Sequence, residues 1–157
     1  MKKYSFVFLV LGLFSCRTKE NEFVTAEYAK IEGIWTFNTF TVAQNAPDTL
    51  KNFLQSGGFD FHHCQYNAKY VDKNGGYCGG DIELNTVLLS ISNNYSYSDK
   101  LFVFSLGGDR SKIIYKKGSQ IIDGSWDIQI NDDKMTGKRV TAGKDYKGEV
   151  SFTATKK

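Results

Sequence analysis

The sequence predicts an all-β protein, an up-and-down antiparallel β-barrel of about eight to ten strands. Aromatic residues make up 15% of the chain, and they favour strands. The chain has 15 glycines and a single proline, so its turns depend on glycine, asparagine and aspartate. Short segments of alternating apolar and polar residues follow one another through such turns. Closing that sheet into a barrel would remove its exposed edges.

Length and charge limit the possible organisation. The 157 residues suit one domain and an export signal, and the formal charge of +3 falls by two, to +1, once a leader carrying Lys2 and Lys3 is removed. This near-neutral charge offers no electrostatic basis for binding nucleic acid. We expect three segments: a signal peptide over residues 1–15, a lipidated cysteine, tether and short helix over residues 16–31, and a barrel domain over residues 32–157.

The first 16 residues have the features of an export signal. Lys2 and Lys3 precede the apolar stretch Phe6–Phe14, which is too short to cross a membrane. The ending Leu13-Phe14-Ser15-Cys16 resembles the lipobox of bacterial lipoproteins. This resemblance implies that Cys16 is acylated and becomes the first residue of an exported protein, anchored by lipid to the bacterial cell membrane, with the outer membrane as the expected one. The alternative is an ordinary secreted protein with a coincidental cysteine.

The first elements of the domain are a short helix over residues 22–30 and a strand that begins at Gly33. From Gly33 the apolar residues repeat every two positions, so Trp35 and Phe37 share one face. Apolar residues later in the strand fall out of this phase, which predicts a β-bulge near residues 38–39.

A second short helix is expected between the first two strands, because residues 43–56 break the alternation. Pro47 suits its first turn, and Gly57 suits its C-terminal end. Its apolar stripe would either cover an open end of the barrel as a lid or dock on the outside of the barrel. The stripe consists of Leu50, Phe53 and Leu54.

The rest of the chain predicts strands joined by tight turns. In the strand after Gly57, Phe59, Phe61 and His63 should face one side, and the alternate residues Asp60, His62 and Cys64 the other. Further turns are expected at residues 93–94 and 107–110. The later strands are expected over residues 81–92, 95–106, 113–117, 121–130 and 134–141, and from Val150 onward, and the strand over 95–106 is expected to be interrupted near residues 99–100.

A family resemblance accompanies this pattern. The triplet Gly33-Ile34-Trp35 on the first strand, the helix that leads into it and the serial hairpins resemble the lipocalin superfamily, and the second triplet Gly124-Ser125-Trp126 makes the chain most similar to lipocalin-like lipoproteins of bacteria. The resemblance implies a lipocalin-like barrel in which Arg139 lies across the first-strand tryptophan as a cation–π partner.

Cys64 and Cys78 are expected to form a disulfide, because an exported compartment is oxidising. The closed loop of about 15 residues would stabilise the fold by about 3 kcal/mol. The alternative is a zinc or copper site. On one strand, only His62, Cys64 and Asp60 would share a face in such a site, since His63 would point to the other side.

The sequence is compatible with three functions. In the first, an apolar cavity in the barrel binds a small hydrophobic or amphipathic ligand. In the second, side chains fill the barrel, and its outside binds a protein partner at the cell envelope. The third, an enzyme, is the weakest: only Asp60 and His62 would support it, the chain has no recognisable catalytic motif, and no cofactor is expected. The candidate ligand contacts are Trp35, Phe37, Phe59, Trp126 and Phe152.

Overall fold

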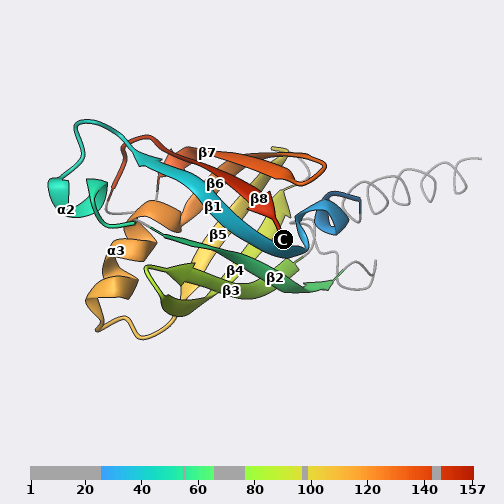
Figure 1. Ribbon diagram of the computed structural model, residues 1–157, viewed down its shortest axis with the longest axis horizontal. Helices are drawn as coiled ribbons and strands as arrows, with labels where there is room; N and C mark the ends of the chain where they lie inside the picture. Colours follow the sequence, from blue (N-terminus) through green and yellow to red (C-terminus); the bar gives the residue numbers. More distant parts are fainter. Residues whose placement is uncertain (1–25, 55, 66–76, 97–98, 143–145) are drawn as a thin grey trace, which may run out of the picture.

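Eight antiparallel strands form a closed barrel in the computed structural model, which describes residues 26–54, 56–65, 77–96, 99–142 and 146–157 (Figure 1). Each strand pairs with the next in sequence, and β8 closes the barrel against β1. The prediction of an up-and-down all-β barrel is therefore confirmed. The strands are β1 (Gly33–Val42), β2 (Gly57–Gln65), β3 (Tyr77–Leu84), β4 (Val87–Ser96), β5 (Leu101–Gly107), β6 (Gly124–Asn131), β7 (Lys134–Ala142) and β8 (Val150–Lys156).

Helices lie at the two ends of the barrel. A helix over residues 26–31 leads into β1, and its Tyr28 and Ile31 are fully buried. We call this the N-terminal end; the C-terminus also lies there (Figure 1). The helices α2 (Asp48–Lys51) and α3 (Ile113–Ile122) lie at the opposite end, which we call the α3 end.

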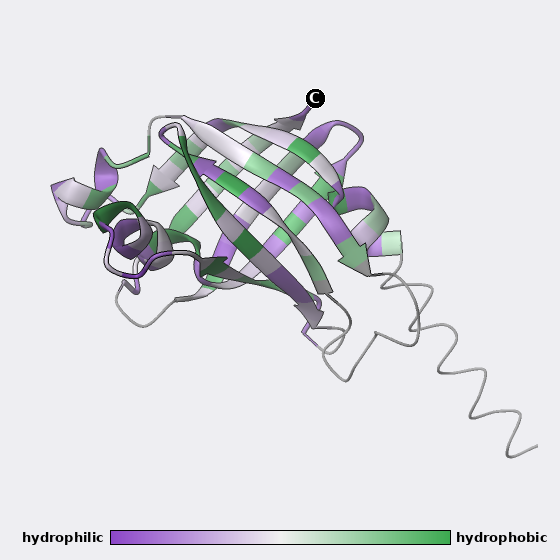
Figure 2. Cartoon of the chain, turned by 90° about the horizontal axis from the view of Figure 1, so that it is seen from below, coloured by the Kyte–Doolittle hydropathy of each residue, from purple (hydrophilic) through white to green (hydrophobic). Residues whose placement is uncertain are grey.

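The predicted alternation holds along β1, β6 and β8. Strand β1 shifts its register against β8 between Phe37 and Thr39, so the predicted bulge is present. Along β8, Val150, Phe152 and Ala154 are buried while the residues between them are more exposed. Figure 2 shows the resulting bands of hydrophobic and hydrophilic residues along the strands. One face of these strands therefore supplies the core.

The single strand predicted over residues 81–92 is wrong, because a hairpin divides it. Strand β3 ends at Leu84 and β4 begins at Val87, and the two residues between them have positive φ angles of 50° and 71°. Such angles define the tight turns that suit the twist of antiparallel strands, and asparagine adopts them readily. In the sequence, Ile82 and Leu84 are out of phase with Val87, Leu89 and Ile91, and this shift marks the turn that Asn85 and Thr86 form.

The turn predicted at residues 93–94 is also wrong, because both asparagines lie within β4. Asn93 and Asn94 pair with Phe104 and Val103 of β5. The chain instead turns at residues 99–100, before β5 begins at Leu101. Asparagine pairs favour turns by local propensity, but here strand pairing on both sides overrides that preference.

The strand predicted over residues 113–117 is wrong, because α3 occupies residues Ile113–Ile122. Isoleucines favour strands, and Gly118-Ser119 has the composition of a turn. Gly118 instead faces the core, where a Cβ atom would lie 2.8 Å from Leu84 Cδ1. The glycine thus lets α3 approach the barrel closely, and Ile121 and Ile122 are fully buried at this end.

The short helix α2 begins after Pro47 and is capped by Asn52 rather than by Gly57, which starts β2 instead. Its Leu50 is buried, while the apolar residues that follow are partly buried. Phe53 lies under Lys117 of α3, with 5.6 Å between Nζ and the ring centroid. Closure of this end is therefore shared between α3 and the α2 segment. The predicted leader, Cys16, the start of the first helix, and the segments 67–76 and 143–145 lie outside the described residues.

Candidate functional site

Four of the five residues predicted to contact a ligand meet inside the barrel. The ring of Phe59 lies 4.8 Å from that of Phe37 and 5.3 Å from that of Phe152, and Phe152 lies 5.4 Å from Trp126. Trp35, the fifth, is buried beside Phe59, its partner in the β1–β2 register, closer to the N-terminal end. The predicted residues therefore contact one another.

Further aromatic side chains, which were not among the predicted site residues, extend this cluster. Phe61, Phe102 and Phe104 are buried, and their rings are joined to the cluster through centroid distances of 5.1–6.5 Å. Aromatic pairs at such distances interact favourably, and interiors packed in this way leave little space. The signal for these residues was the spacing Phe-x-Phe, which occurs on β2 and again on β5. The interior is thus occupied by the protein's own rings.

The two tryptophans occupy equivalent places at opposite ends of the barrel. Each follows a helix, an acidic residue and a glycine with φ near 130°: 127° for Gly33 and 132° for Gly124. The indole Nε1 of Trp35 donates a hydrogen bond to the carbonyl of Ile31 (2.8 Å), and that of Trp126 donates to Ile122 (2.7 Å). Each bond joins a barrel strand to the last residue of the preceding helix.

The partner strands repeat the same arrangement. Phe59 and Phe61 of β2 pair with Trp35 and Gly33. In the same register, Phe102 and Phe104 of β5 pair with Trp126 and Gly124. Each Gly-x-Trp triplet therefore lies against a Phe-x-Phe triplet, and this unit closes each end of the barrel.

Arg139 does not lie across Trp35, as the lipocalin resemblance implied. Lys156 takes that place, with Nζ 5.3 Å from the Trp35 ring. Arg139 pairs with Trp126 in the β6–β7 register at the α3 end, and it is 6% exposed. Its guanidinium donates to the carbonyls of Gln120 (2.7 Å), Tyr146 (2.9 Å) and Gly148 (2.9 Å), and thereby ties α3 to the segment before β8.

Burial at the α3 end changes two pKa values. It lowers the pKa of Arg139, and the neighbouring Tyr146 and Asp123 oppose this effect. Burial raises the pKa of Asp123, although its Oδ1 accepts a hydrogen bond from the backbone N–H of Leu106 at 2.7 Å. Charged groups favour water, so burying the charged forms of Arg139 and Asp123 costs free energy.

The predicted Cys64–Cys78 disulfide is confirmed. The two cysteines are directly opposite each other in the β2–β3 register, and Cys78 is fully buried. The predicted alternation ends just before them, because the register shifts between Phe61 and His63. This bulge turns Cys64 toward the core.

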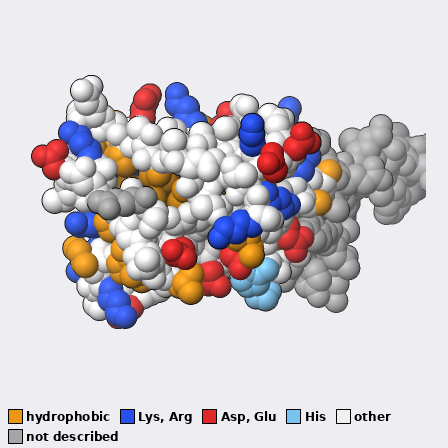
Figure 3. Space-filling view, in the orientation of Figure 1, with side chains coloured by type: hydrophobic (Ala, Val, Ile, Leu, Met, Phe, Trp, Pro, Cys, Tyr) orange, Lys and Arg blue, Asp and Glu red, His pale blue; other side chains and the backbone are white. Residues whose placement is uncertain are grey.

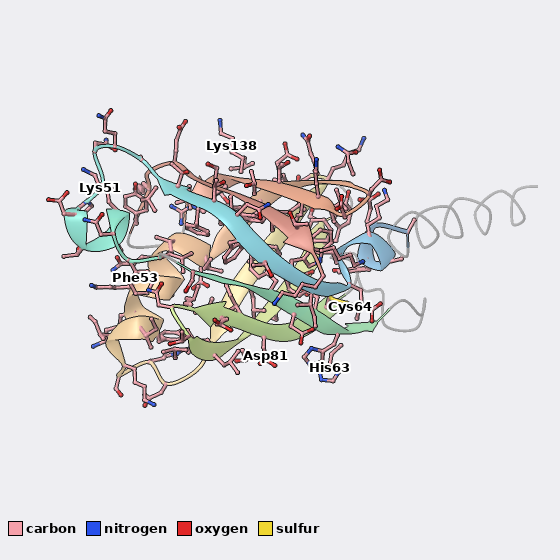
Figure 4. The ribbon with its side chains drawn as sticks, in the orientation of Figure 1. Lys51, Phe53, His63, Cys64, Asp81 and Lys138 are labelled. Carbon is pink, nitrogen blue, oxygen red and sulfur yellow. A yellow bond between two sulfur atoms is a disulfide. The ribbon has the colours of Figure 1, made fainter. Side chains whose placement is uncertain are left out.

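The same bulge corrects the predicted position of His63, which is exposed like His62 rather than sharing a face with the phenylalanines. The two imidazole rings lie 4.1 Å apart, and His63 points away from the barrel (Figure 4). His62 Nδ1 lies 3.3 Å from Asp60 Oδ1. Because Cys64 faces the core, it is separated from Asp60 and His62, the other ligands of the predicted metal site. The described residues contain no group of three or more metal-binding side chains.

A hollow of about 370 Å³ lies on the outer surface of β1, β2, β3 and β4. We call it the β1–β4 hollow. Two rows of outward residues cross it in register: Ile34, Asp60 and Asp81 in one row, and Thr36, Gly58, Glu83 and Leu88 in the other. Figure 3 shows acidic and hydrophobic side chains side by side on this face, next to the pale blue histidines.

Asn93 is a polar exception in the interior. It faces inward from β4, is 1% exposed, and pairs in register with Cys78 and Phe104. Neither its Oδ1 nor its Nδ2 has a hydrogen-bond partner in the part of the chain that the structure describes. A buried amide without hydrogen-bond partners lowers the stability of the fold unless a water molecule or a ligand forms those hydrogen bonds.

No protein-family model, curated protein or solved structure matches the chain. Among the described residues, no helix has both the length and the apolar character needed to span a membrane.

Proposed function

We propose that this chain is an exported, lipid-anchored β-barrel protein that binds a protein partner through its outer surface, rather than a ligand in its interior. The packing of the interior carries the proposal. The rings of Phe37, Phe59, Phe104, Trp126 and Phe152 contact one another where a ligand would have to lie. Ligand sites in proteins are usually pre-formed cavities of about 300–1,000 Å³. A ligand inside this barrel would need such a cavity in the place that the rings occupy.

Two features support export and anchoring. The stretch that ends in Ser15-Cys16 resembles a lipobox, and the disulfide between Cys64 and Cys78 suits an oxidising compartment. Acylation of Cys16 by several chains would give stable membrane binding, because each buried CH₂ contributes about 0.8 kcal/mol. The lipid would hold the barrel at the membrane and leave its outer surface free for a partner.

Two measurements test the proposal. Cells given radiolabelled palmitate should label the wild-type chain but not Cys16→Ala. Full-length protein with Cys16→Ser should show no saturable uptake of an environment-sensitive fluorescent fatty acid. Equal palmitate labelling of both chains would contradict the lipid anchor, and stoichiometric uptake of the fatty acid would contradict the filled interior.

The second candidate function is binding of a small amphipathic ligand inside the barrel, and Asn93 favours it. Within the described ranges its amide has no hydrogen-bond partner, so it offers one donor group and one acceptor to a neutral polar ligand. This candidate predicts saturable uptake of the fatty-acid probe by the wild type and weaker uptake by Asn93→Leu. If Asn93 holds only a buried water, neither protein binds the probe.

A further inference from the structure

The β1–β4 hollow owes its shape to a missing side chain. Gly58 lies in the middle of an outward row, between Thr36 of β1 and Glu83 of β3. A Cβ atom at Gly58 would lie 2.0 Å from the carbonyl oxygen of Trp35, so a larger residue would require the backbone to move. The backbone therefore forms the floor of the hollow, and the neighbouring side chains form its walls.

In the described strands, the acidic side chains of the hollow do not lie opposite basic residues. Asp60 and Asp81 lie directly opposite each other on β2 and β3, and Glu83 follows on the same face. Like charges in such a pair destabilise a sheet. On the other side of the barrel, by contrast, Asp127 lies opposite Lys138.

Two cationic groups lie near these carboxylates. His62 approaches Asp60 at 3.3 Å, and Lys157 lines the hollow beside Ile34, whose carbonyl accepts a hydrogen bond from the Lys157 backbone N–H. Three carboxylates thus face one lysine and a histidine that is charged only when protonated. By formal charge the carboxylates of the hollow outnumber its cationic groups, so the hollow is complementary to a cation.

Apolar side chains border the same hollow. Ile34 is 48% exposed and Leu88 is 67% exposed, and both are among the most exposed large hydrophobic residues of the described chain. They stand on β1 and β4, on either side of the carboxylates of β2 and β3. An occupant would therefore bury aliphatic groups against the two walls and place a positive charge between them.

We propose that the β1–β4 hollow binds a basic, aliphatic segment of a protein partner, with a lysine or arginine over Asp60 and Asp81 and apolar residues against Ile34 and Leu88. A volume of about 370 Å³ holds a few side chains of such a segment. This inference rests on the proposed function, because it names the surface through which the lipid-anchored barrel meets its partner.

Photo-crosslinking in the cells that produce the protein tests this assignment. Full-length protein carries p-benzoylphenylalanine in place of Leu88, or at one of two exposed apolar control positions, Val140 of β7 and Ile113 of α3. We expect the Leu88 position to crosslink a different protein, through a peptide that contains lysine or arginine. The control positions should not crosslink that protein.

Charge variants complete the test. The double variant Asp60→Asn/Asp81→Asn should reduce the Leu88 crosslink by about tenfold, which corresponds to about 1.4 kcal/mol. Asp127→Asn, which removes a carboxylate opposite Lys138, should change the yield of the Leu88 crosslink by less than about twofold. Thermal unfolding of each variant checks that the barrel is intact, because substitutions on its outer face should have small effects.

The outcomes separate this inference from the proposed function. Crosslinks from Val140 or Ile113 but not from Leu88 would overturn the hollow as the docking site and leave partner binding in place. The absence of crosslinks from all three positions would contradict both. A Leu88 crosslink that joins two copies of this chain, captures a segment without basic residues, or ignores the double variant would overturn the assigned partner chemistry.

Discussion

Trp35 and Trp126 make the same hydrogen bond at opposite ends of the barrel, each from its indole Nε1 to the carbonyl four residues earlier. Those carbonyls belong to Ile31 and Ile122, the last residues of the two helices that close the ends. Each indole also fills the core beside a phenylalanine of the neighbouring strand. The barrel is therefore closed twice by one local arrangement of residues.

Replacing either tryptophan by phenylalanine should destabilise the fold by similar amounts. Trp35→Phe and Trp126→Phe each remove the donor to a helix-terminal carbonyl and some buried ring volume, at an expected cost of about 1–3 kcal/mol. Urea unfolding measures both values. A loss below about 0.5 kcal/mol for one variant alone would show that the two positions are not equivalent.

Arg139→Lys should be much more harmful than Arg110→Lys. Arg139 donates to three backbone carbonyls from a buried position, and a lysine ammonium lacks the planar fork that reaches all three. We expect a loss of about 2–3 kcal/mol in the free energy of unfolding. Arg110 is exposed, so its conservative replacement should change stability by less than about 0.5 kcal/mol. Equal effects would contradict the role given to Arg139.

Asp123→Asn should change how stability depends on pH. Burial raises the pKa of Asp123 in the folded state, so the native protein holds this proton more tightly than the unfolded chain does. The stability that Asp123 contributes is therefore fully present below the unfolded value near 3.8 and is lost as the pH rises through the raised folded pKa. Asparagine keeps an acceptor for the Leu106 N–H but does not titrate.

Urea unfolding of both proteins at pH 3 and pH 7 checks this sign. Relative to Asp123→Asn, the wild type should be more stable at pH 3 than it is at pH 7. The variant also corrects for all other groups that titrate over this range, because they are shared. A wild type that gains stability over the variant as the pH rises would contradict the raised pKa.

Loss of the Cys64–Cys78 disulfide should weaken the barrel without changing its topology. The bridge spans a sequence separation of 14 residues, and its removal in Cys64→Ser/Cys78→Ser should cost about 3 kcal/mol through loop-closure entropy. Thermal unfolding with and without reductant measures the effect. The double variant should be insensitive to reductant, whereas an equally insensitive wild type would show that the bridge does not stabilise the fold.

The barrel was predictable where local patterns and tertiary structure agree. The strand of Trp126, the final strand with Phe152 and the bulge after Phe37 all follow from two-residue alternation. Helix α3 was missed because its isoleucines and Gly118 favour a strand and a turn locally, and the glycine is explained by the close contacts with Leu84 and Leu106 that only the fold creates.

The candidate sites were less predictable than the fold. The cysteine pair could be predicted from export and spacing, and the candidate ligand residues from their inward phase. The opposition of Asp60 and Asp81 could not, because it depends on the register of two strands separated by residues 66–76. The position of His63 likewise depends on a bulge in β2 that lies opposite Gly79 and Gly80 of β3, and this opposition is visible only once the two strands are paired.

Benzene binding tests the central claim, a barrel filled by its own side chains, most directly. Phe59→Ala should lose about 3–5 kcal/mol and open an apolar cavity, and such cavities stay dry and bind benzene. Chemical shift changes in ¹H–¹⁵N spectra, recorded during a benzene titration, report binding in both proteins. The filled barrel predicts saturable shifts in Phe59→Ala and none in the wild type. Saturable shifts at interior residues of the wild type would contradict it.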